Sequence, residues 1–206
     1  MTSTTLLDVS QTLLTGTIPS QLGLMSNMTE LLLYQSLLSG SIPSAVGMFT
    51  ALRRFHVWQN SLTNVIPTEM GMLGNLEELS LDNNRVSGSL PSTLGLMTSL
   101  RRLFFRDTAL TGTIPDEFGN LEDLQVWWMQ ETDLSGSLPA TLENLSQLRI
   151  MSFNNTRLIG TVPEALCFMR DESCDYVDPY IFPKTCILEF QCTDALCGCD
   201  CPCQDE

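Results

Sequence analysis

The sequence predicts a solenoid of the α/β class, in which short parallel strands stack and each strand is followed by a returning segment. The main evidence is a period of 24 residues that runs from residue 4 to about residue 166. A fixed period of this length is typical of repeat proteins, because each unit buries its apolar face only by stacking on its neighbours. Two series advance by 24 without a slip: the apolar residues Met28, Leu52, Leu76, Leu100, Leu124 and Leu148, and the prolines Pro19, Pro43, Pro67, Pro91, Pro115, Pro139 and Pro163.

Each unit begins with one short predicted strand. Apolar residues alternate with period two, as in Leu79/Leu81 and Leu103/Phe105, which is the strand signal. We expect the following Gly-x-Ile-Pro segment to end the strand and turn the chain back outside the sheet. In the third unit Asn64 replaces the glycine, which is tolerable because Asn also reaches left-handed backbone angles. Seven strands at ~4.8 Å spacing would form a concave sheet on the order of 30 Å long.

The unit from residue 76 reads LEELSLDNNRVSGSLPSTLGLMTS. It resembles the plant-type leucine-rich repeat, L-x-x-L-x-L-x-x-N-x-L-x-G-x-I-P-x-x-L-G-x-L-x-x, and the resemblance covers residues 4–166. It implies a right-handed superhelix with a curved parallel sheet on the concave face and short 3-10 or irregular segments on the convex face. The ninth position of this repeat normally holds Asn, whose amide bonds the neighbouring turn. Here Asn60 and Asn84 keep it while Thr12, Ser36, Thr108, Thr132 and Thr156 do not, so we expect a looser ladder, because hydroxyls reach less far.

Composition excludes several classes of partner. The 206 residues are 43% hydrophobic, which suits one ordinary domain, and the net charge is −14. This acidity argues against nucleic acid and anionic membrane surfaces as partners. No apolar run approaches the ~18 residues of a membrane span.

The cysteines divide the chain into residues 1–166, a solenoid of about seven repeats that lacks an N-terminal cap, and residues 167–206, an acidic, Cys-rich cap or tail. Their even number and clustering predict disulfides formed in an oxidising compartment. The alternative is a metal clasp at residues 197–203, where thiols alternate. The tail resembles those of secreted or surface leucine-rich repeat proteins of microalgae. The cysteines are Cys167, Cys174, Cys186, Cys192, Cys197, Cys199, Cys201 and Cys203.

Glycosylation triplets at Asn27, Asn144 and Asn154 agree with an extracellular or cell-surface location. Residues from Met1 onward enter the first repeat without the apolar core of a signal peptide. We therefore expect this chain to be the C-terminal part of a longer protein, with a signal or anchor upstream of Met1. The alternative is an intracellular solenoid.

The concave face is the candidate ligand-binding surface. At the third position of successive units the charge alternates in sign, in Glu30, Arg54, Glu78 and Arg102. This predicts a charge ladder, in which side chains on neighbouring strands pair with one another, and not a binding patch. The fifth and seventh positions place large aromatic side chains on the open sheet, where recognition surfaces use them, while Trp127 points inward. The alternative is cross-strand aromatic packing without a ligand. The candidate residues are Tyr34, His56, Trp58, Asp82, Phe104, Arg106, Trp128 and Gln130.

No catalytic residue, metal or cofactor is predicted. The only histidine, His56, lies one strand from Ser80, but no third group or oxyanion device accompanies the pair. The sequence therefore predicts a non-enzymatic recognition module that binds a peptide, a protein or a glycan on its concave face. The resemblance implies the extracellular part of a receptor-like or secreted protein. A structural or adhesive cell-wall protein and an intracellular scaffold are the alternatives.

Overall fold

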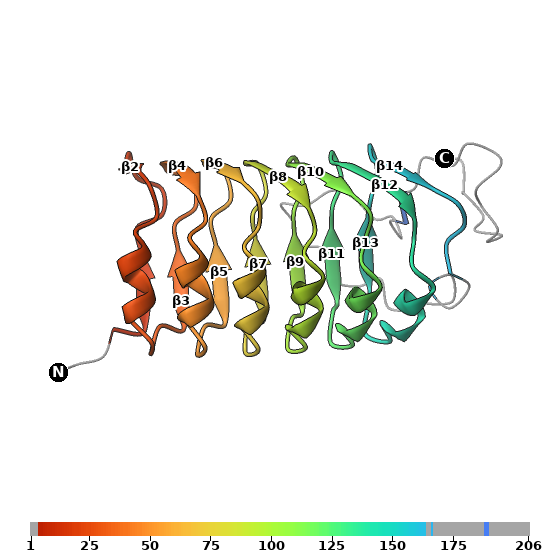
Figure 1. Ribbon diagram of the computed structural model, residues 1–206, viewed down its shortest axis with the longest axis horizontal. Helices are drawn as coiled ribbons and strands as arrows, with labels where there is room; N and C mark the ends of the chain where they lie inside the picture. Colours follow the sequence, from red (N-terminus) through yellow and green to blue (C-terminus); the bar gives the residue numbers. More distant parts are fainter. Residues whose placement is uncertain (1–3, 164–165, 167–187, 190–206) are drawn as a thin grey trace, which may run out of the picture.

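The computed structural model describes residues 4–163, 166 and 188–189, and its repeats form one elongated stack (Figure 1). Each repeat contributes a strand to a first sheet and a strand to a second sheet, and within the described residues six repeats also form a 3-10 helix. The first sheet is parallel in the order β1-β3-β5-β7-β9-β11-β13-β15. Its strands are β1 (Leu6–Asp8), β3 (Glu30–Leu32), β5 (Arg54–His56), β7 (Glu78–Ser80), β9 (Arg102–Phe104), β11 (Val126–Trp128), β13 (Ile150–Ser152) and β15 (Leu188–Glu189).

Register in this sheet follows the repeat. Residues 24 apart are partners, as in Glu30 with Arg54 and Glu78 with Arg102. The predicted solenoid fold, with short 3-10 segments outside a parallel sheet, is confirmed. Because the register never slips, every repeat position becomes a row of side chains along the stack.

The sequence interpretation missed a second parallel sheet. We expected the segment before each proline to leave the sheet, but Leu37–Ser41 and its equivalents pair with one another in the order β14-β12-β10-β8-β6-β4-β2. Gly40 has a φ of 77° and Asn64 one of 68°, so one left-handed residue bends these strands without ending the pairing. The strands are β2 (Thr15–Gly16), β4 (Leu37–Ser41), β6 (Ser61–Asn64), β8 (Arg85–Ser89), β10 (Ala109–Gly112), β12 (Asp133–Ser137) and β14 (Arg157–Ile159).

The 3-10 helices each start directly after the repeated proline, whose fixed φ suits the last extended residue before the turn. They stack closely because a glycine stands near the end of the first five. A Cβ on Gly71 or Gly95 would collide with the carbonyl oxygen of Thr93 or Glu117 in the next repeat. The helices are η1 (Ser20–Leu24), η2 (Ser44–Met48), η3 (Thr68–Met72), η4 (Ser92–Leu96), η5 (Asp116–Asn120) and η6 (Ala140–Asn144).

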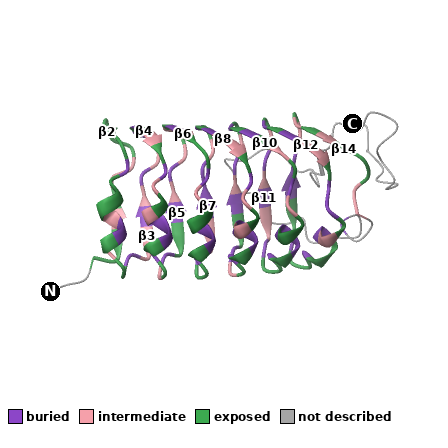
Figure 2. Cartoon of the chain, in the orientation of Figure 1, coloured by how far each residue is buried: buried purple, intermediate pink, exposed green. Residues whose placement is uncertain are grey.

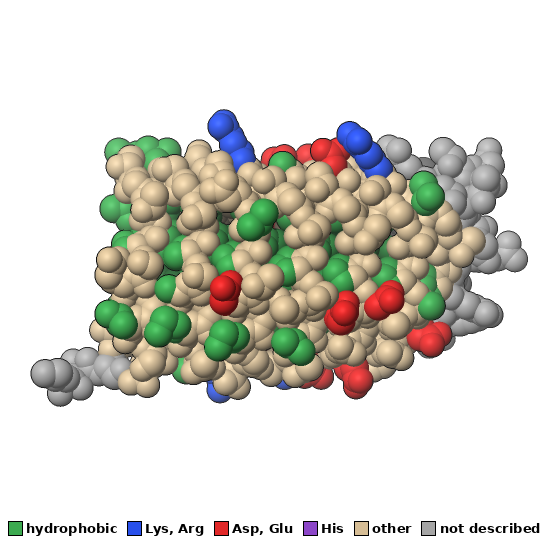
Figure 3. Space-filling model, viewed as in Figure 1, with side chains coloured by type: hydrophobic (Ala, Val, Ile, Leu, Met, Phe, Trp, Pro, Cys, Tyr) green, Lys and Arg blue, Asp and Glu red, His purple; other side chains and the backbone are tan. Residues whose placement is uncertain are grey.

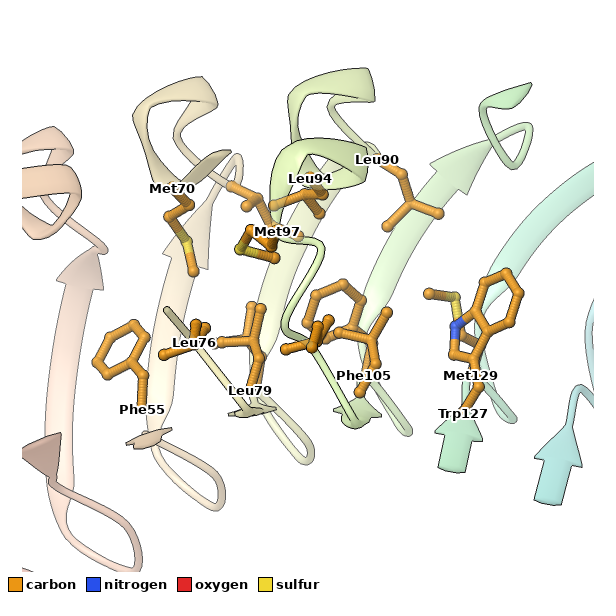
Figure 4. Packing of buried hydrophobic residues seen from close by; sticks show 14 of the residues in the cluster. Phe55, Met70, Leu76, Leu79, Leu90, Leu94, Met97, Phe105, Trp127 and Met129 are labelled. Atoms are coloured by element: carbon orange, nitrogen blue, oxygen red, sulfur yellow. The ribbon is translucent and has the colours of Figure 1, made fainter. Parts of the chain in front are cut away.

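The core is a continuous column between the first sheet and the 3-10 helices (Figure 2). Met70 and Leu94 point from the 3-10 side toward Phe55 and Leu79 on the strands (Figure 4). All four are fully buried or nearly so. In the fourth repeat the buried positions are Leu76, Leu79, Leu81, Val86, Leu90, Leu94 and Met97, and the fifth repeat buries the equivalent seven residues.

The polar ladder under the turns confirms the expectation drawn from the ninth position. The amide of Asn84 accepts the N–H of Leu62 (3.0 Å) and donates to the carbonyl of Val57 (2.9 Å), so it joins two repeats. The hydroxyls of Thr108 and Thr132 donate only to carbonyls three residues earlier in their own repeat. Asparagine thus ties the middle of the stack more firmly than threonine ties its C-terminal part.

Candidate functional site

The candidate site is built on the solvent side of the first sheet. Side chains alternate across a strand, so the third, fifth and seventh positions face out while the fourth and sixth enter the core. Trp127 is fully buried, as predicted, where it stacks on Phe118 and meets Phe153 edge-on. Its neighbour Trp128 is half-buried on the opposite side. One residue of register therefore decides which tryptophan supports the core and which faces solvent.

The charged side chains at the third position of the repeats form ion pairs with one another across neighbouring strands. Arg54 bonds Glu30 at 2.9 Å and Arg102 bonds Glu78 at 2.8 Å, while Arg53 bonds Glu77 at 3.0 Å beside them. The predicted charge ladder is thus confirmed. Exposed pairs of this kind contribute about 0–1 kcal/mol each, so this row organises the surface and leaves little unpaired charge for a ligand.

The aromatic side chains form two pairs. Tyr34 stacks on Trp58, with ring centroids 4.6 Å apart and planes 6° apart. Phe104 and Trp128 lie 4.9 Å apart with planes tilted by 59°. The cross-strand packing that we considered for these residues is therefore present. All four rings remain half-buried and not fully covered, so the pairs are rigid apolar surfaces held in place before any ligand arrives.

A polar centre lies between the two pairs. Asp82 accepts the backbone N–H of Arg106 at 2.7 Å and a hydrogen bond from Ser80. Burial of this carboxyl raises its pKa to about 7, against the lowering effect of its bonds to Arg106. The Nε atom of Arg106 and the Oε1 atom of Gln130 are both buried without a hydrogen-bond partner in the described part of the chain. Arg106 approaches Glu131 only at 3.7 Å.

His56 and Ser80 are cross-strand partners, but they do not form a nucleophile and base. The imidazole Nε2 lies 3.3 Å from Oε2 of Glu78 without the geometry of a hydrogen bond. The pKa of Glu78 is lowered first by its interaction with His56, against the opposing effect of burial, and also by Arg102. The hydroxyl of Ser80 is engaged with Asp82 instead. The imidazole of His56 is therefore paired with Glu78 and not with Ser80.

The site is a surface and not a pocket. A depression of about 290 Å³ lies at the turn beyond the sheet, lined by Asn60, Ser61, Asn83, Asn84, Arg85 and Asp107. It is too shallow and polar for the enclosed apolar site that small molecules favour. Within the described residues, no group of three or more His, Cys, Asp or Glu side chains is placed to hold a metal ion.

A ladder of hydrogen-bonded glutamines at the eighth position of the first three repeats was not predicted. Gln11 donates to Gln35 at 3.0 Å, and Gln35 donates to Gln59 at 3.1 Å. These residues occupy the eighth position, where the backbone is left-handed with φ near 50° to 55°. The signal in the sequence was the recurrence of Gln every 24 residues.

The sequence model of the family described as Leucine Rich Repeat matches residues 75–97 and 99–121. The chain is a leucine-rich repeat protein. Among curated proteins none matches it.

Solved structures of leucine-rich repeat ectodomains are similar to this chain. One is the ectodomain of the plant membrane receptor kinase GASSHO1/SCHENGEN3 from Arabidopsis thaliana, in complex with CASPARIAN STRIP INTEGRITY FACTOR 2: 36% identity, TM-score 0.73, covering 76% of this chain and 19% of that one. A further similar structure is that of PEPR1-AtPEP1, which has 35% identity and a TM-score of 0.76, and the match covers 78% of this chain and 23% of that one. The ectodomain of the Arabidopsis receptor kinase HAESA, in complex with an IDA peptide hormone, shares 29% identity with a TM-score of 0.75, covering 79% and 27%. This leucine-rich repeat chain thus spans less than a third of the length of each.

The remaining predicted sites lie apart from the concave centre. Asn27 and Asn144 are exposed in the returning part of their repeats, and Asn154 is half-buried just after β13. All eight cysteines lie outside the described residues. No helix in the described part of the chain has the length and apolar character needed to cross a membrane.

Proposed function

We propose that this leucine-rich repeat chain is a non-enzymatic recognition module that binds a peptide or a protein segment on its concave face. The observation that carries the proposal is the arrangement of the aromatic side chains at the fifth and seventh positions of the repeats. The pairs Tyr34/Trp58 and Phe104/Trp128 lie on either side of Asp82. Rigid aromatic side chains contribute contact area at low entropic cost, and central polar groups orient the ligand.

The spacing of the two aromatic pairs favours an extended peptide. Their centres are three repeats apart, which at ~4.8 Å per strand is about 14 Å. An extended chain covers this distance in about four residues at ~3.3 Å each. A peptide with apolar side chains about four residues apart would therefore contact both pairs and pass over Asp82. The similar HAESA ectodomain is in complex with a peptide hormone, which supports this class of ligand over a glycan.

The proposed setting is outside the cell, as part of a receptor-like or secreted protein. The similarity to receptor ectodomains supports this, as do the eight cysteines, which we propose form disulfides. Exposed Asn27 and Asn144 are accessible for glycosylation, whereas a glycan on Asn154 would cover the C-terminal end of the concave face. A count of free thiols and bound zinc in the purified protein tests the disulfides: free thiols together with zinc would favour the metal clasp.

The binding test uses a displayed library of linear peptides of about twelve residues, selected on the immobilised full chain, and a glycan array as the competing probe. We expect selected peptides to carry two apolar residues about four positions apart. Trp58→Ala and Trp128→Ala should each weaken their binding at least tenfold. Leu37→Ala, which removes an exposed side chain from the second sheet, is the matched control and should leave it unchanged.

Circular dichroism must show that both tryptophan variants remain folded. Selected peptides that bind equally well after both substitutions would show that the site is wrong. Binding to the glycan array alone would change the ligand class. The absence of any saturable ligand, with indifference to both substitutions, would instead favour a structural or adhesive wall protein.

A further inference from the structure

The outer edge of the stack carries an exposed apolar row that the proposed ligand site does not use. The last residue of each of the first four 3-10 helices is a large apolar side chain, and each is mostly exposed: Leu24 (77%), Met48 (52%), Met72 (61%) and Leu96 (62%). Figure 3 shows apolar side chains along this edge of the N-terminal half. We call these four residues the outer row.

The outer row is a feature of four repeats and not of the fold. The equivalent residues in the next two repeats are Asn120 and Asn144, so the position accepts a polar side chain without loss of the helix. The charges also change at this boundary. From the 3-10 helix to the next strand, the first four repeats carry two acidic residues, Glu69 and Glu77, and two basic residues, Arg53 and Arg101. The next two repeats carry Asp116, Glu117, Glu122, Asp123 and Glu143 with only Arg149 of opposite sign.

The four side chains of the outer row stand on adjacent 3-10 helices, η1 to η4. Because glycines such as Gly23 and Gly47 let neighbouring 3-10 helices approach each other, the four side chains follow one another at the repeat spacing; the sulfur of Met48 would lie 3.2 Å from a Cβ on Gly23. From their exposed fractions, the four residues together expose on the order of 400 Å², which is within the range of the largest apolar patch on an ordinary monomer, and such a patch is often functional. Water contact with this surface is costly at about 25 cal/mol per Å², so a covering partner is favoured.

We propose that the outer row is the contact of a two-fold dimer of this chain, in which two rows pack antiparallel. The order Leu, Met, Met, Leu reads the same in both directions. A two-fold axis between Met48 and Met72 would place Met48 against Met72 of the partner subunit and Leu24 against Leu96 of the partner subunit. Such an interface is self-complementary, as two-fold contacts require.

The charge distribution selects the antiparallel arrangement. In an antiparallel dimer centred on the outer row, the acidic fifth and sixth repeats of each copy extend past the first repeat of the other copy. The acidic side chains of these repeats therefore face solvent. A parallel arrangement would set the residues around Asp116 and Glu143 against their own copies, and like charges so placed repel.

The size of the outer row predicts a weak dimer. Even complete burial of both rows would cover less than about 1,000 Å² in total, which is below the ~1,200–2,000 Å² of stable specific interfaces and in the range of weak, transient contacts. We therefore expect a weak association that is seen only at high protein concentration. The concave sheet lies on the opposite side of the core from the 3-10 helices (Figure 4), so dimerisation and the proposed ligand binding should be independent.

The test is sedimentation equilibrium of the full chain, enzymatically deglycosylated because Asn27 lies near Leu24, from about 1 to about 300 µM. We expect the parent chain to dimerise over this range. The double variant Met48→Asn/Met72→Asn, which introduces the side chain that the fifth and sixth repeats already hold, should associate at least tenfold more weakly. Leu37→Asn, an exposed apolar residue outside the outer row, is the matched control and should behave as the parent.

The register is tested by complementary charges. Leu24→Lys and Leu96→Glu should each weaken self-association, but an equimolar mixture of the two variants should restore a dimer, because the antiparallel register sets Lys against Glu. A parent chain that stays monomeric at the highest concentration would overturn the proposal. So would undiminished association of the Met48→Asn/Met72→Asn variant, or a mixture that fails to dimerise.

Discussion

The buried carboxyl of Asp82 makes a sharp prediction for the dependence of stability on pH. Its pKa is about 7 in the folded chain against an ordinary value of 3.8. Between these values the folded state holds a proton that the unfolded state has released, so the free energy of unfolding falls as pH rises. Each pH unit in this interval removes about 1.4 kcal/mol. From pH 5 to pH 8 the loss is at most about 3 kcal/mol, and we expect about 1–3 kcal/mol because Asp82 keeps some contact with water.

Asp82→Asn isolates this effect. The amide keeps an acceptor for the N–H of Arg106 but does not titrate. Glu78, whose pKa is lowered from 4.5, stays ionised in the folded state throughout this range. Its small contribution near pH 5, from partial protonation in the unfolded state, is the same in parent and variant and cancels in their difference. The assay is urea unfolding followed by tryptophan fluorescence at pH 5 and pH 8, for the parent and for Asp82→Asn. The parent should lose about 1–3 kcal/mol more than the variant between the two pH values. Equal losses in the two proteins, within about 0.5 kcal/mol, would refute burial as the cause of the raised pKa.

Three further predictions concern stability, each measured by urea unfolding. Gly95→Ala should cost about 1–3 kcal/mol or more, because the new Cβ meets the backbone of the next repeat, whereas Gly74→Ala, where space is open, should cost little; equal effects would contradict the close-stacking argument. Asn84→Ala should cost about 1–3 kcal/mol by leaving buried backbone groups unpaired, and a neutral result would remove its role in tying repeats. Trp127→Ala should cost about 3–5 kcal/mol and Trp128→Ala under about 1.5 kcal/mol; the reverse order would mean that the strand register is wrong.

The sequence was sufficient for the solenoid because its evidence recurs in every unit. A single alternating pair such as Leu79/Leu81 is a weak strand signal, but the same pair at a fixed interval in seven units leaves one register in which these paired strand positions all face the core. The same register assigned Trp127 to the interior and Trp128 to the surface. The second sheet escaped prediction because Gly40 and Pro43 normally indicate the end of a strand, and only pairing with neighbouring repeats makes the residues between them a ladder.

For the candidate site, the sequence determined which side chains share the concave face, since that follows from repeat position alone. It did not determine how those side chains interact. Whether Tyr34 stacks on Trp58, or Asp82 turns to bond Arg106, depends on rotamers and on burial by neighbouring strands, which no periodicity contains.

What the sequence by itself determined was the period, the strand register and the inward or outward direction of each side chain, because these are local properties repeated along the chain. What only the tertiary structure decided was the environment of each group: the desolvation that raises the pKa of Asp82, the ion pairs that saturate the third-position row, and the alignment of Leu24, Met48, Met72 and Leu96 into one exposed edge. These arise between repeats, where residues 24 positions apart become neighbours only after the stack has formed.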